Sequence, residues 1–374
     1  MSKKFLSLII AVSLILVIGL SVPFFGLAES EDTIKIGVII PLTGKISDIG
    51  EAEKNGIELA VNRINLNRGI NNKKIELIYE DSQGKPDVAV AAYQKLKTID
   101  NIKYIVAAQS SVILSIGPLA EQDKIVLLTI SSLSPKVSEL GDYIFRHNLY
   151  PKDDAEFLAE TICKLGYKEI GYLMENTESA KTYFPVFDTK FKSLGCEIEI
   201  KEVYNTETLD FKTHLLKIKE SEVEVIFTYS HAIETANMMK QAEELDLKLQ
   251  WVSMFNLENK IVIETAGRLA DGALFSSMYN VDGKSLKTRD FRDSFVLKYE
   301  EKPETFAALA YDDIFILADA MSRCNKLTST CVKDEMYNVN IEGVTGKIWF
   351  DEKGDSHKEL FLKTVKNGQF VEYN

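Results

Sequence analysis

The sequence predicts an α/β protein built from two lobes, each a doubly wound parallel sheet. Three observations lead to this prediction. Short apolar runs alternate with amphipathic stretches from residue 34 onward, which is the order typical of βαβ units. The pattern restarts after the extended stretch YIFRHNLYP, which contains Pro151. The 374 residues are also about twice the length of a usual domain.

The first series of elements opens with the strands TIKIGVII and KKIELIYE, which enclose a helix over residues 50–66. Apolar residues recur on this helix at helical spacing, namely Ile57, Ala60, Val61 and Ile64. The series continues with a helix at 86–99, a strand at 104–108, a helix at 111–123 and a strand at 125–130. Strands separated by helices in this order predict a parallel sheet.

The second series repeats this alternation after Pro151. It comprises helices at 152–165, 180–194, 209–219 and 232–245, and strands at 169–174, 197–203, 223–229, 249–254 and 272–277. Near the C-terminus, ALAYDDIFILADAM predicts an amphipathic helix, and VTGKIWFDEKGD and LFLKTVKNGQFVEY predict β segments. Asn367-Gly368 predicts a hairpin turn, because both residues tolerate positive φ.

These elements suggest where each lobe begins and ends. We expect the first part of lobe 1 in residues 29–147 and lobe 2 in residues 148–278. Residues 279–374 are expected to hold hinge crossings, a C-terminal helix that returns to lobe 1, and the terminal β segments. The chain then crosses between the lobes more than once.

Residues 1–28 predict a signal peptide. A basic start is followed by an apolar run over residues 5–20, and Gly26 and Ala28 then stand where a small-x-small cleavage site would lie. The alternative is an uncleaved membrane anchor, because residues 5–27 are long enough to span a bilayer core of about 30 Å. With either interpretation, we expect the rest of the chain to work outside the cytoplasm, in the periplasm or at the cell surface.

The charge of the chain argues against nucleic acid as a partner. Removal of the signal peptide would delete two lysines and no acidic residue, which takes the formal net charge from −12 to −14. An acidic surface repels the phosphate backbone, and the sequence has no basic stripe to bind it.

Four cysteines lie outside the signal peptide. Cys324 and Cys331 are close enough in sequence for a local disulfide, and Cys163 with Cys196 would then join the middle region. Buried free thiols are the alternative for this second pair. The sequence has no CxxC motif, so neither redox chemistry nor structural zinc is supported.

The common catalytic motifs GxSxG, HExxH, the P-loop and GxGxxG do not occur in the sequence. Ser82 and Lys85 fit SxxK, but they stand at a polar turn before Pro86. The histidines lack metal-ligand spacing; they are His147, His214, His231 and His357. Asp312 and Asp313 are adjacent, so on a helix they point in different directions, and we expect them at the surface or facing the hinge. We therefore predict no catalysis, no metal and no cofactor.

Hydroxyl side chains follow two neighbouring strands of the first predicted sheet. Gln109-Ser110-Ser111 comes after IVAA, and Ser131-Ser132-Leu133-Ser134 comes after IVLLTI. In open parallel sheets, ligands bind beyond the carboxyl ends of the strands, near helix N-termini. Hydroxyl groups and free backbone N–H groups at two such places can hold a carboxylate. The alternative is that these serines are ordinary helix caps.

The sequence resembles the extracellular binding proteins of the leucine/isoleucine/valine-binding type. Its PLTG, NRINLNRGI and EDSQGKP match that family in order, as do FAALAYDDIFILADAM and VTGKIWFDEKGD near the C-terminus. The resemblance covers nearly the whole chain after the signal peptide. It implies the type I periplasmic-binding fold, in which two lobes joined by a multi-strand hinge trap a ligand between them.

The resemblance implies that the first lobe binds a carboxylate. Ser110 matches the family's carboxylate-binding serine, and Ser111 directly after it is expected to contact the ligand as well. Ser132, Leu133 and Ser134 match the second carboxylate-binding loop. Leu133 takes the place of a threonine there, so backbone donors or Ser134 would serve.

The resemblance also implies ligand contacts at four places where this chain departs from the family. Ile49 replaces an aromatic residue of the first loop, and Ser179 and His231 stand at or near the places of two tyrosines. Phe255 takes the place of the acid that holds the ammonium of an amino acid. A buried ammonium without a carboxylate partner is unfavourable, so a plain α-amino acid is disfavoured unless another acid substitutes. The candidates are Glu175, Glu178 and Glu258.

The function implied by the resemblance is capture of a small organic solute, an amino acid or a related carboxylate or amide, for an ABC importer. The expected partners are the small-molecule ligand and the membrane subunits of an ABC permease, and the expected state is a monomer. The alternative is a ligand-sensing subunit of the same fold that serves a chemoreceptor or a sensor kinase.

Overall fold

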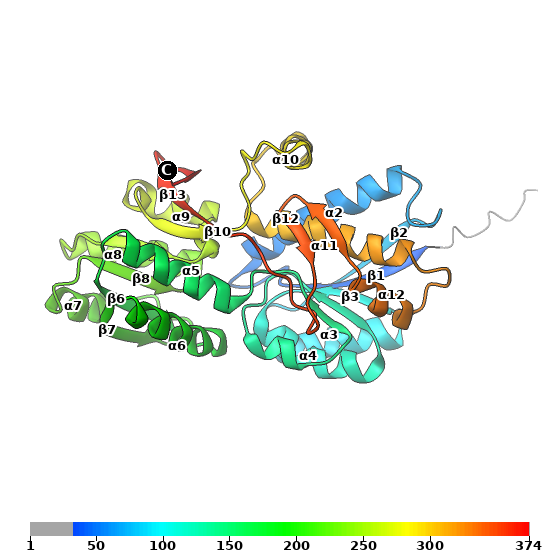
Figure 1. Ribbon diagram of the computed structural model, residues 1–374, viewed down its shortest axis with the longest axis horizontal. Coiled ribbons are helices and arrows are strands. Elements are labelled where there is room, and N and C mark those ends of the chain that lie inside the picture. The colour runs from blue at the N-terminus through cyan, green and yellow to red at the C-terminus, as the bar shows by residue number, and fades with distance from the viewer. Residues whose placement is uncertain (1–32, 374) are drawn as a thin grey trace, which may run out of the picture.

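The computed structural model describes residues 33–373, and these form two α/β lobes, with the second lobe on the left and the first on the right of Figure 1. Residues 1–32, which hold the predicted signal peptide 1–28, lie outside the described residues. Within residues 33–373, no helix combines the length and apolar character needed to cross a membrane.

In the described part of the chain, the sheet of the first lobe has five parallel strands in the order β2-β1-β3-β4-β5. They are β1 (Ile34–Ile40), β2 (Ile75–Asp81), β3 (Tyr104–Ala107), β4 (Val126–Thr129) and β5 (Ile144–Arg146). Strands β1, β3 and β4 are almost wholly buried, as expected for a parallel sheet covered on both faces. This strand order reverses between β1 and β3, which is where ligands bind in such sheets.

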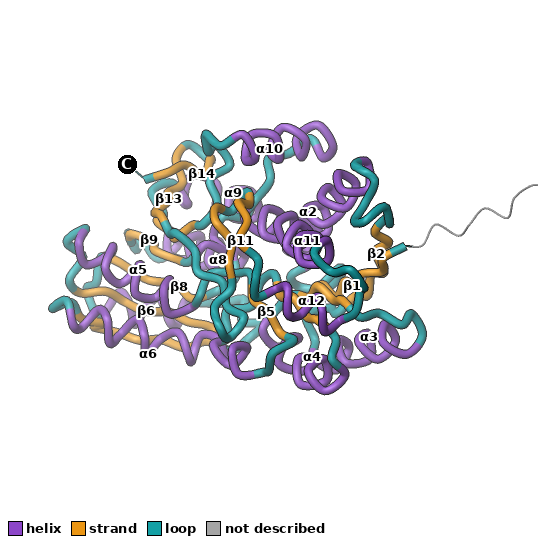
Figure 2. The backbone as a smooth tube through the Cα atoms, turned by 45° about the vertical axis from the view of Figure 1, so that its right-hand side comes forward, coloured by secondary structure: helices purple, strands orange, loops and turns teal. Residues whose placement is uncertain are grey.

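Two layers of helices cover the first sheet. Helices α3 (Pro86–Thr98) and α4 (Ser110–Asp123) pack on one face, and α2 (Ser47–Leu66) and α11 (Thr305–Ser322) pack on the other. Helices α2 and α11 lie side by side (Figure 2). Gly56 permits this close packing, because a Cβ atom there would lie 2.1 Å from the carbonyl oxygen of Ala307.

Within residues 33–373, the sheet of the second lobe has seven strands in the order β14-β13-β10-β9-β8-β6-β7. The strands are β6 (Glu169–Glu175), β7 (Glu197–Tyr204), β8 (Val225–Tyr229), β9 (Gln250–Ser253), β10 (Leu274–Ser277), β13 (Phe361–Lys366) and β14 (Gln369–Glu372). The helices are α5 (Pro151–Lys164), α6 (Glu178–Ser193), α7 (Lys212–Glu220), α8 (Ala232–Glu244) and α9 (Lys260–Ala266). β13 and β14 pair antiparallel, whereas β6 to β10 are parallel. The α/β prediction with parallel sheets is confirmed.

The chain passes between the lobes at residues 147–150, 278–285 and 350–360. The first and third passages are joined by hydrogen bonds. Arg146, which ends β5 directly before the first passage, donates its N–H to the Gly354 carbonyl at 2.7 Å and accepts from the Ser356 N–H at 2.9 Å, and the Ser356 hydroxyl donates to the Asn148 carbonyl at 3.2 Å. These bonds link the passages through backbone groups and one side chain.

Three helices and one strand are present that the sequence pattern does not predict. The helices are α9 (Lys260–Ala266), α10 (Leu286–Tyr299) and α12 (Ser329–Met336), and the strand is β11 (Asn340–Gly343), which pairs with β12 (Gly346–Trp349). Only Thr288, Phe291 and Phe295 of α10 are buried, so its apolar stripe is too narrow to give a clear periodic signal. The predicted hairpin at Asn367-Gly368 is confirmed, with φ of 52° and 68° between β13 and β14.

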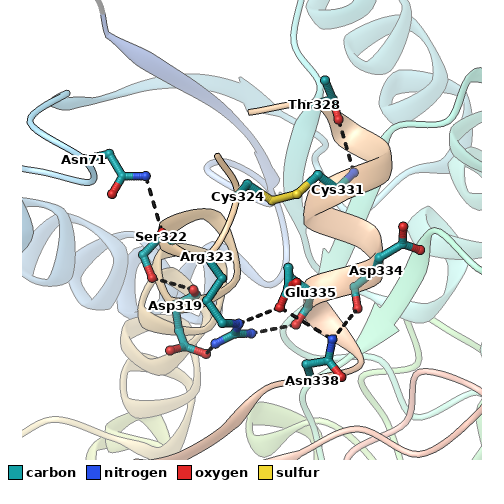
Figure 3. The surroundings of a disulfide bond; sticks show 10 residues. All are labelled: Asn71, Asp319, Ser322, Arg323, Cys324, Thr328, Cys331, Asp334, Glu335 and Asn338. Carbon is teal, nitrogen blue, oxygen red and sulfur yellow. Dashed lines mark hydrogen bonds and ion pairs between the residues drawn. A yellow bond between two sulfur atoms is a disulfide. The ribbon is translucent and has the colours of Figure 1, made fainter. Parts of the chain in front are cut away.

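All four cysteines form disulfides. Cys163 at the end of α5 is bonded to Cys196 just before β7, and Cys324 after α11 is bonded to Cys331 in α12. Figure 3 shows the second bond beside Arg323, whose Nε atom donates to Glu335 at 2.7 Å. The disulfide and this ion pair together fasten α12 to the end of α11.

Candidate functional site

A cavity of about 540 Å³ lies between the two lobes. It opens at the carboxyl ends of β1 and β3 in the first lobe and of β6, β8 and β9 in the second. The first lobe contributes Ile49, Ser110, Ser111, Leu114, Leu133 and Phe306. The second lobe contributes Glu175, Ser179, Tyr229, His231, Met254 and Phe255. The cavity is therefore at the place where parallel sheets bind ligands, with walls from both lobes.

The polar wall of the first lobe is built around Ser110, the first residue of α4. Its hydroxyl accepts a hydrogen bond from the Leu133 N–H at 3.1 Å and one from the Ser132 hydroxyl at 3.2 Å. No side chain caps α4, so the N–H groups of its first turn are not used by a cap. A helix start with free N–H groups and a hydroxyl is suited to an anion such as a carboxylate.

Ser132 and Ser134, which were predicted to help Ser110 bind the carboxylate, do not line the cavity. Both are fully buried behind its wall. Ser132 lies against Ser110, while the carbonyl oxygen of Ser134 accepts a hydrogen bond from Arg146 at 2.8 Å. Ser132 therefore orients Ser110, and Ser134 belongs to the packing of the loop.

The apolar wall is formed by residues from both lobes. Phe255 of the second lobe is 2% exposed, and its ring centroid lies 5.5 Å from that of Phe306 in α11 of the first lobe. Ile49 and Leu133 line the same cavity, and Tyr229 stands at the end of β8. Burial raises the pKa of the Tyr229 hydroxyl, so this group is neutral at physiological pH. The wall is suited to an uncharged organic body.

Charged groups also line the cavity. Lys45, in the loop between β1 and α2, reaches Glu234 at 2.5 Å and Glu175 at 3.7 Å in the second lobe. Burial lowers the pKa of Lys45, but the hydrogen bond and charge of Glu234, supported by Glu175, outweigh it and the net shift is upward. His231, which directly precedes α8, lies 3.8 Å from the Glu175 carboxylate. Ser179 contacts the Thr177 hydroxyl at 3.3 Å beside these groups.

The other two acids considered as ammonium partners are engaged elsewhere. Glu258 is buried, does not line the cavity, and pairs with Lys363 while accepting from Thr305 at 2.9 Å. Glu178 lines the rim and forms an ion pair with Lys136 of the first lobe at 2.5 Å. Neither provides a free carboxylate next to Phe255.

Sequence reasoning missed Lys45 and also Glu53. Glu53 is fully buried in α2, where its carboxylate accepts a hydrogen bond from the cavity residue Ser131 at 2.7 Å. Desolvation raises its pKa to about 8. A signal for it exists, because Glu53 lies four residues before Ile57 and so shares the buried face of α2.

The expectation that Asp312 and Asp313 lie at the surface is wrong. Both are fully buried at the hinge side of α11. Asp312 accepts hydrogen bonds from the N–H groups of Val344 and Thr345 at 2.9 Å, and Asp313 contacts His147 at 2.7 Å. Backbone and side-chain partners satisfy the Asp312 carboxylate, whereas one oxygen of Asp313 has no hydrogen-bond partner among the described residues and burial raises the pKa of that group well above its ordinary value. Within residues 33–373, no cluster of three or more His, Cys, Asp or Glu side chains is arranged to hold a metal.

Comparison with known proteins gives consistent matches over nearly the whole chain. A family model described as "Periplasmic binding protein" matches residues 33–369. The leucine-, isoleucine-, valine-, threonine- and alanine-binding protein of Pseudomonas aeruginosa is 23% identical over 356 residues, which cover 94% of this chain and 92% of that protein.

Solved structures give the same result. The branched-chain amino acid transporter substrate-binding protein LivJ from Streptococcus pneumoniae, in complex with isoleucine, has a TM-score of 0.85 and 26% identity, covering 90% of this chain and 97% of that one. An ABC transporter solute-binding protein from Rhodopseudomonas palustris, in complex with 3,4-dihydroxybenzoic acid, has a TM-score of 0.85 and 22% identity, covering 92% and 97%. The family match spans far more than half of the residues, and this chain belongs to the periplasmic binding protein family.

Proposed function

We propose that this protein is an exported solute-binding protein that captures one small organic carboxylate between its lobes and delivers it to an ABC importer. One observation carries the proposal: a cavity of about 540 Å³ has a hydroxyl and helix-start wall in one lobe and a largely apolar wall shared with the other. Its volume falls within the range of small-molecule sites, about 300–1,000 Å³.

The proposed binding mode follows from the two walls. The solute carboxylate accepts hydrogen bonds from the Ser110 hydroxyl and the first N–H groups of α4, where the helix dipole favours a negative charge. Its organic body packs against Phe255, Phe306 and Ile49. Since Ser110 belongs to the first lobe and Phe255 to the second, the solute binds most tightly when the two lobes are close together. The solute thereby shifts the equilibrium between open and closed forms.

The ligands of similar proteins support a carboxylate. Isoleucine and 3,4-dihydroxybenzoic acid, bound by the two solved relatives, share a carboxyl group attached to an organic body. They differ in the presence of an ammonium group. The first lobe of this protein can bind the carboxyl group that the two ligands share.

Binding without chemistry is the second part of the proposal. The hydroxyl of Ser110 is bonded to Leu133 and Ser132, and His231 approaches Glu175 instead of a serine. The residues that line the cavity therefore form no serine–histidine pair of the kind that activates a nucleophile. We infer that the bound solute is released unchanged.

Isothermal titration calorimetry on residues 29–374, with a panel of amino acids and small carboxylates, tests the proposal. One solute or a narrow group is expected to bind with a 1:1 stoichiometry, and the solute recovered after incubation is expected to be intact. Analytical ultracentrifugation is expected to give a monomer with and without solute. Failure of every member of a broad panel to bind, or turnover of the solute that binds, would contradict it.

A further inference from the structure

One lysine of the first lobe reaches across the cavity to two acids of the second. Lys45 lies in the loop after β1, whereas Glu175 ends β6 and Glu234 lies in the first turn of α8. The Lys45 ammonium is 2.5 Å from Glu234 and 3.7 Å from Glu175. Both acids are buried, with side chains 3% and 5% exposed, while Lys45 is 38% exposed. A lysine of the first lobe thus pairs with two buried acids of the second.

A cation nearby stabilises a buried carboxylate. Removing a carboxylate from water is unfavourable unless it is paired and hydrogen-bonded. Lys45 supplies an ammonium group to both acids, and His231 lies 3.8 Å from Glu175 on its other side. The part of the second lobe suited to an ammonium group is therefore occupied by a side chain of the protein itself.

The rest of the cavity offers little to a second ammonium. The acids that line it are Glu175, Glu178 and Glu207. Glu178 pairs with Lys136 at the rim, and Glu207 is exposed in a loop. The apolar wall of the cavity carries Phe255, which is buried against Phe306.

We propose that Lys45 is a specificity-determining residue: it occupies the carboxylates of the second lobe, so that the preferred solute is a carboxylate without an α-ammonium group. This inference rests on the proposed function and narrows its solute class to 2-oxo, 2-hydroxy, aliphatic or aromatic acids. An α-amino acid would bring a second cation into a site already holding Lys45, and would place its ammonium against an apolar wall.

Matched pairs of solutes test this inference in the full mature protein. L-Leucine is compared with 4-methyl-2-oxopentanoate, and L-phenylalanine with phenylpyruvate and 3-phenylpropanoate, by isothermal titration calorimetry. The wild-type protein is expected to bind the deaminated member at least about tenfold more tightly, which is the effect of a single unpaired polar group. Equal or tighter binding of the amino acid overturns the inference.

Substitution of the lysine tests its role directly. Lys45→Met leaves Glu175 and Glu234 free to hold an ammonium, so the preference for the deaminated member is expected to fall by about tenfold or more. The preference is the ratio of the two Kd values measured within one variant. A change in overall affinity or in lobe closure alters both Kd values alike and so cancels from this ratio. An unchanged ratio in Lys45→Met overturns the assignment.

A control and a reciprocal variant complete the design. Lys260→Met removes an ion pair between the start of α9 in the second lobe and Glu301, in the segment before α11 of the first lobe. Neither residue lines the cavity, so this variant is expected to leave the ratio unchanged. Glu175→Gln reduces the charge available to an ammonium and is expected to keep or increase the preference, so a ratio that falls contradicts the inference. If no member of any pair binds, the proposed function itself fails; if only the amino acids bind, solute capture stands and this inference alone is wrong.

Discussion

The Ser110 hydroxyl accepts a hydrogen bond from the Leu133 N–H group at 3.1 Å. This bond joins the segment after β3 to the segment after β4, which are far apart in the sequence but adjacent in the sheet. The two strand ends are thus held together before a solute arrives. Such preorganisation reduces the ordering that binding requires and directs the Ser110 hydroxyl toward the cavity.

Ser110→Ala is expected to weaken solute binding by about 1.5–3 kcal/mol, roughly a 10- to 150-fold rise in Kd, because a charge-assisted hydrogen bond is lost. The Leu133 N–H also loses its partner. Calorimetry with the best solute measures the change. Ser115→Ala is the matched control, since Ser115 lies on the same helix, bonds to Val112 at 2.7 Å and does not line the cavity. Equal losses in the two variants would contradict the assigned role of Ser110.

Phe255→Glu is expected to weaken binding of a simple carboxylate by at least about tenfold, because a carboxylate in the apolar wall must be desolvated and repels the solute charge. Phe255→Gln has the same shape without the charge and is the control for loss of the ring. The difference in Kd between these two variants measures the charge effect. A Glu variant that binds carboxylates as well as the Gln variant would show that Phe255 does not face the solute.

Glu53→Gln is expected to change how stability depends on pH. The pKa of Glu53 is about 8 in the folded protein, above the ordinary value of 4.5, because the group is desolvated. The folded state therefore keeps a proton that the unfolded chain releases, and the Glu53 contribution to stability falls as pH rises through this window. The variant has no such proton, so its melting temperature should decline less than that of the wild type between about pH 5 and about pH 8.5.

Glu51→Gln is the control for this pH series, because Glu51 is exposed on the same helix. It is expected to follow the wild type at every pH. If Glu53→Gln also follows the wild type, the buried carboxyl does not titrate in this window.

The two disulfides are expected to contribute unequally to stability. Cys163 and Cys196 are 33 residues apart, and Cys324 and Cys331 are 7 apart. Restriction of the unfolded chain predicts about 3.7 kcal/mol for the longer loop and about 2.4 kcal/mol for the shorter one. Denaturant unfolding of the two double Cys→Ser proteins measures both. A larger loss from the shorter loop would contradict this account and point to the packing of α12.

The sequence was sufficient for most of the fold, because each strand is a short apolar run and most helices carry a broad apolar stripe. Helix α10 was not predicted because its apolar stripe, formed by Phe291 and Phe295, is narrow. The short strand β11 has alternating exposure and pairs only with β12, so no apolar run marks it.

The candidate site was predictable where chain order determines position. Ser110 follows a strand, and the carboxyl ends of adjacent parallel strands meet at one edge, so its location could be inferred. Which residues of the next loop face inward could not, and Ser132 proves to be buried behind Ser110. The cluster of Lys45, Glu175 and Glu234 was not predictable, because it depends on how two lobes approach each other.

A crystal structure of the mature protein with the solute that binds most tightly in calorimetry tests the central claim most directly. The account predicts one solute between the lobes, with its carboxylate within hydrogen-bond distance of the Ser110 hydroxyl and the first N–H groups of α4, and its organic body against Phe255. A solute held outside this cavity, or one whose carboxylate binds only to the second lobe, would contradict it.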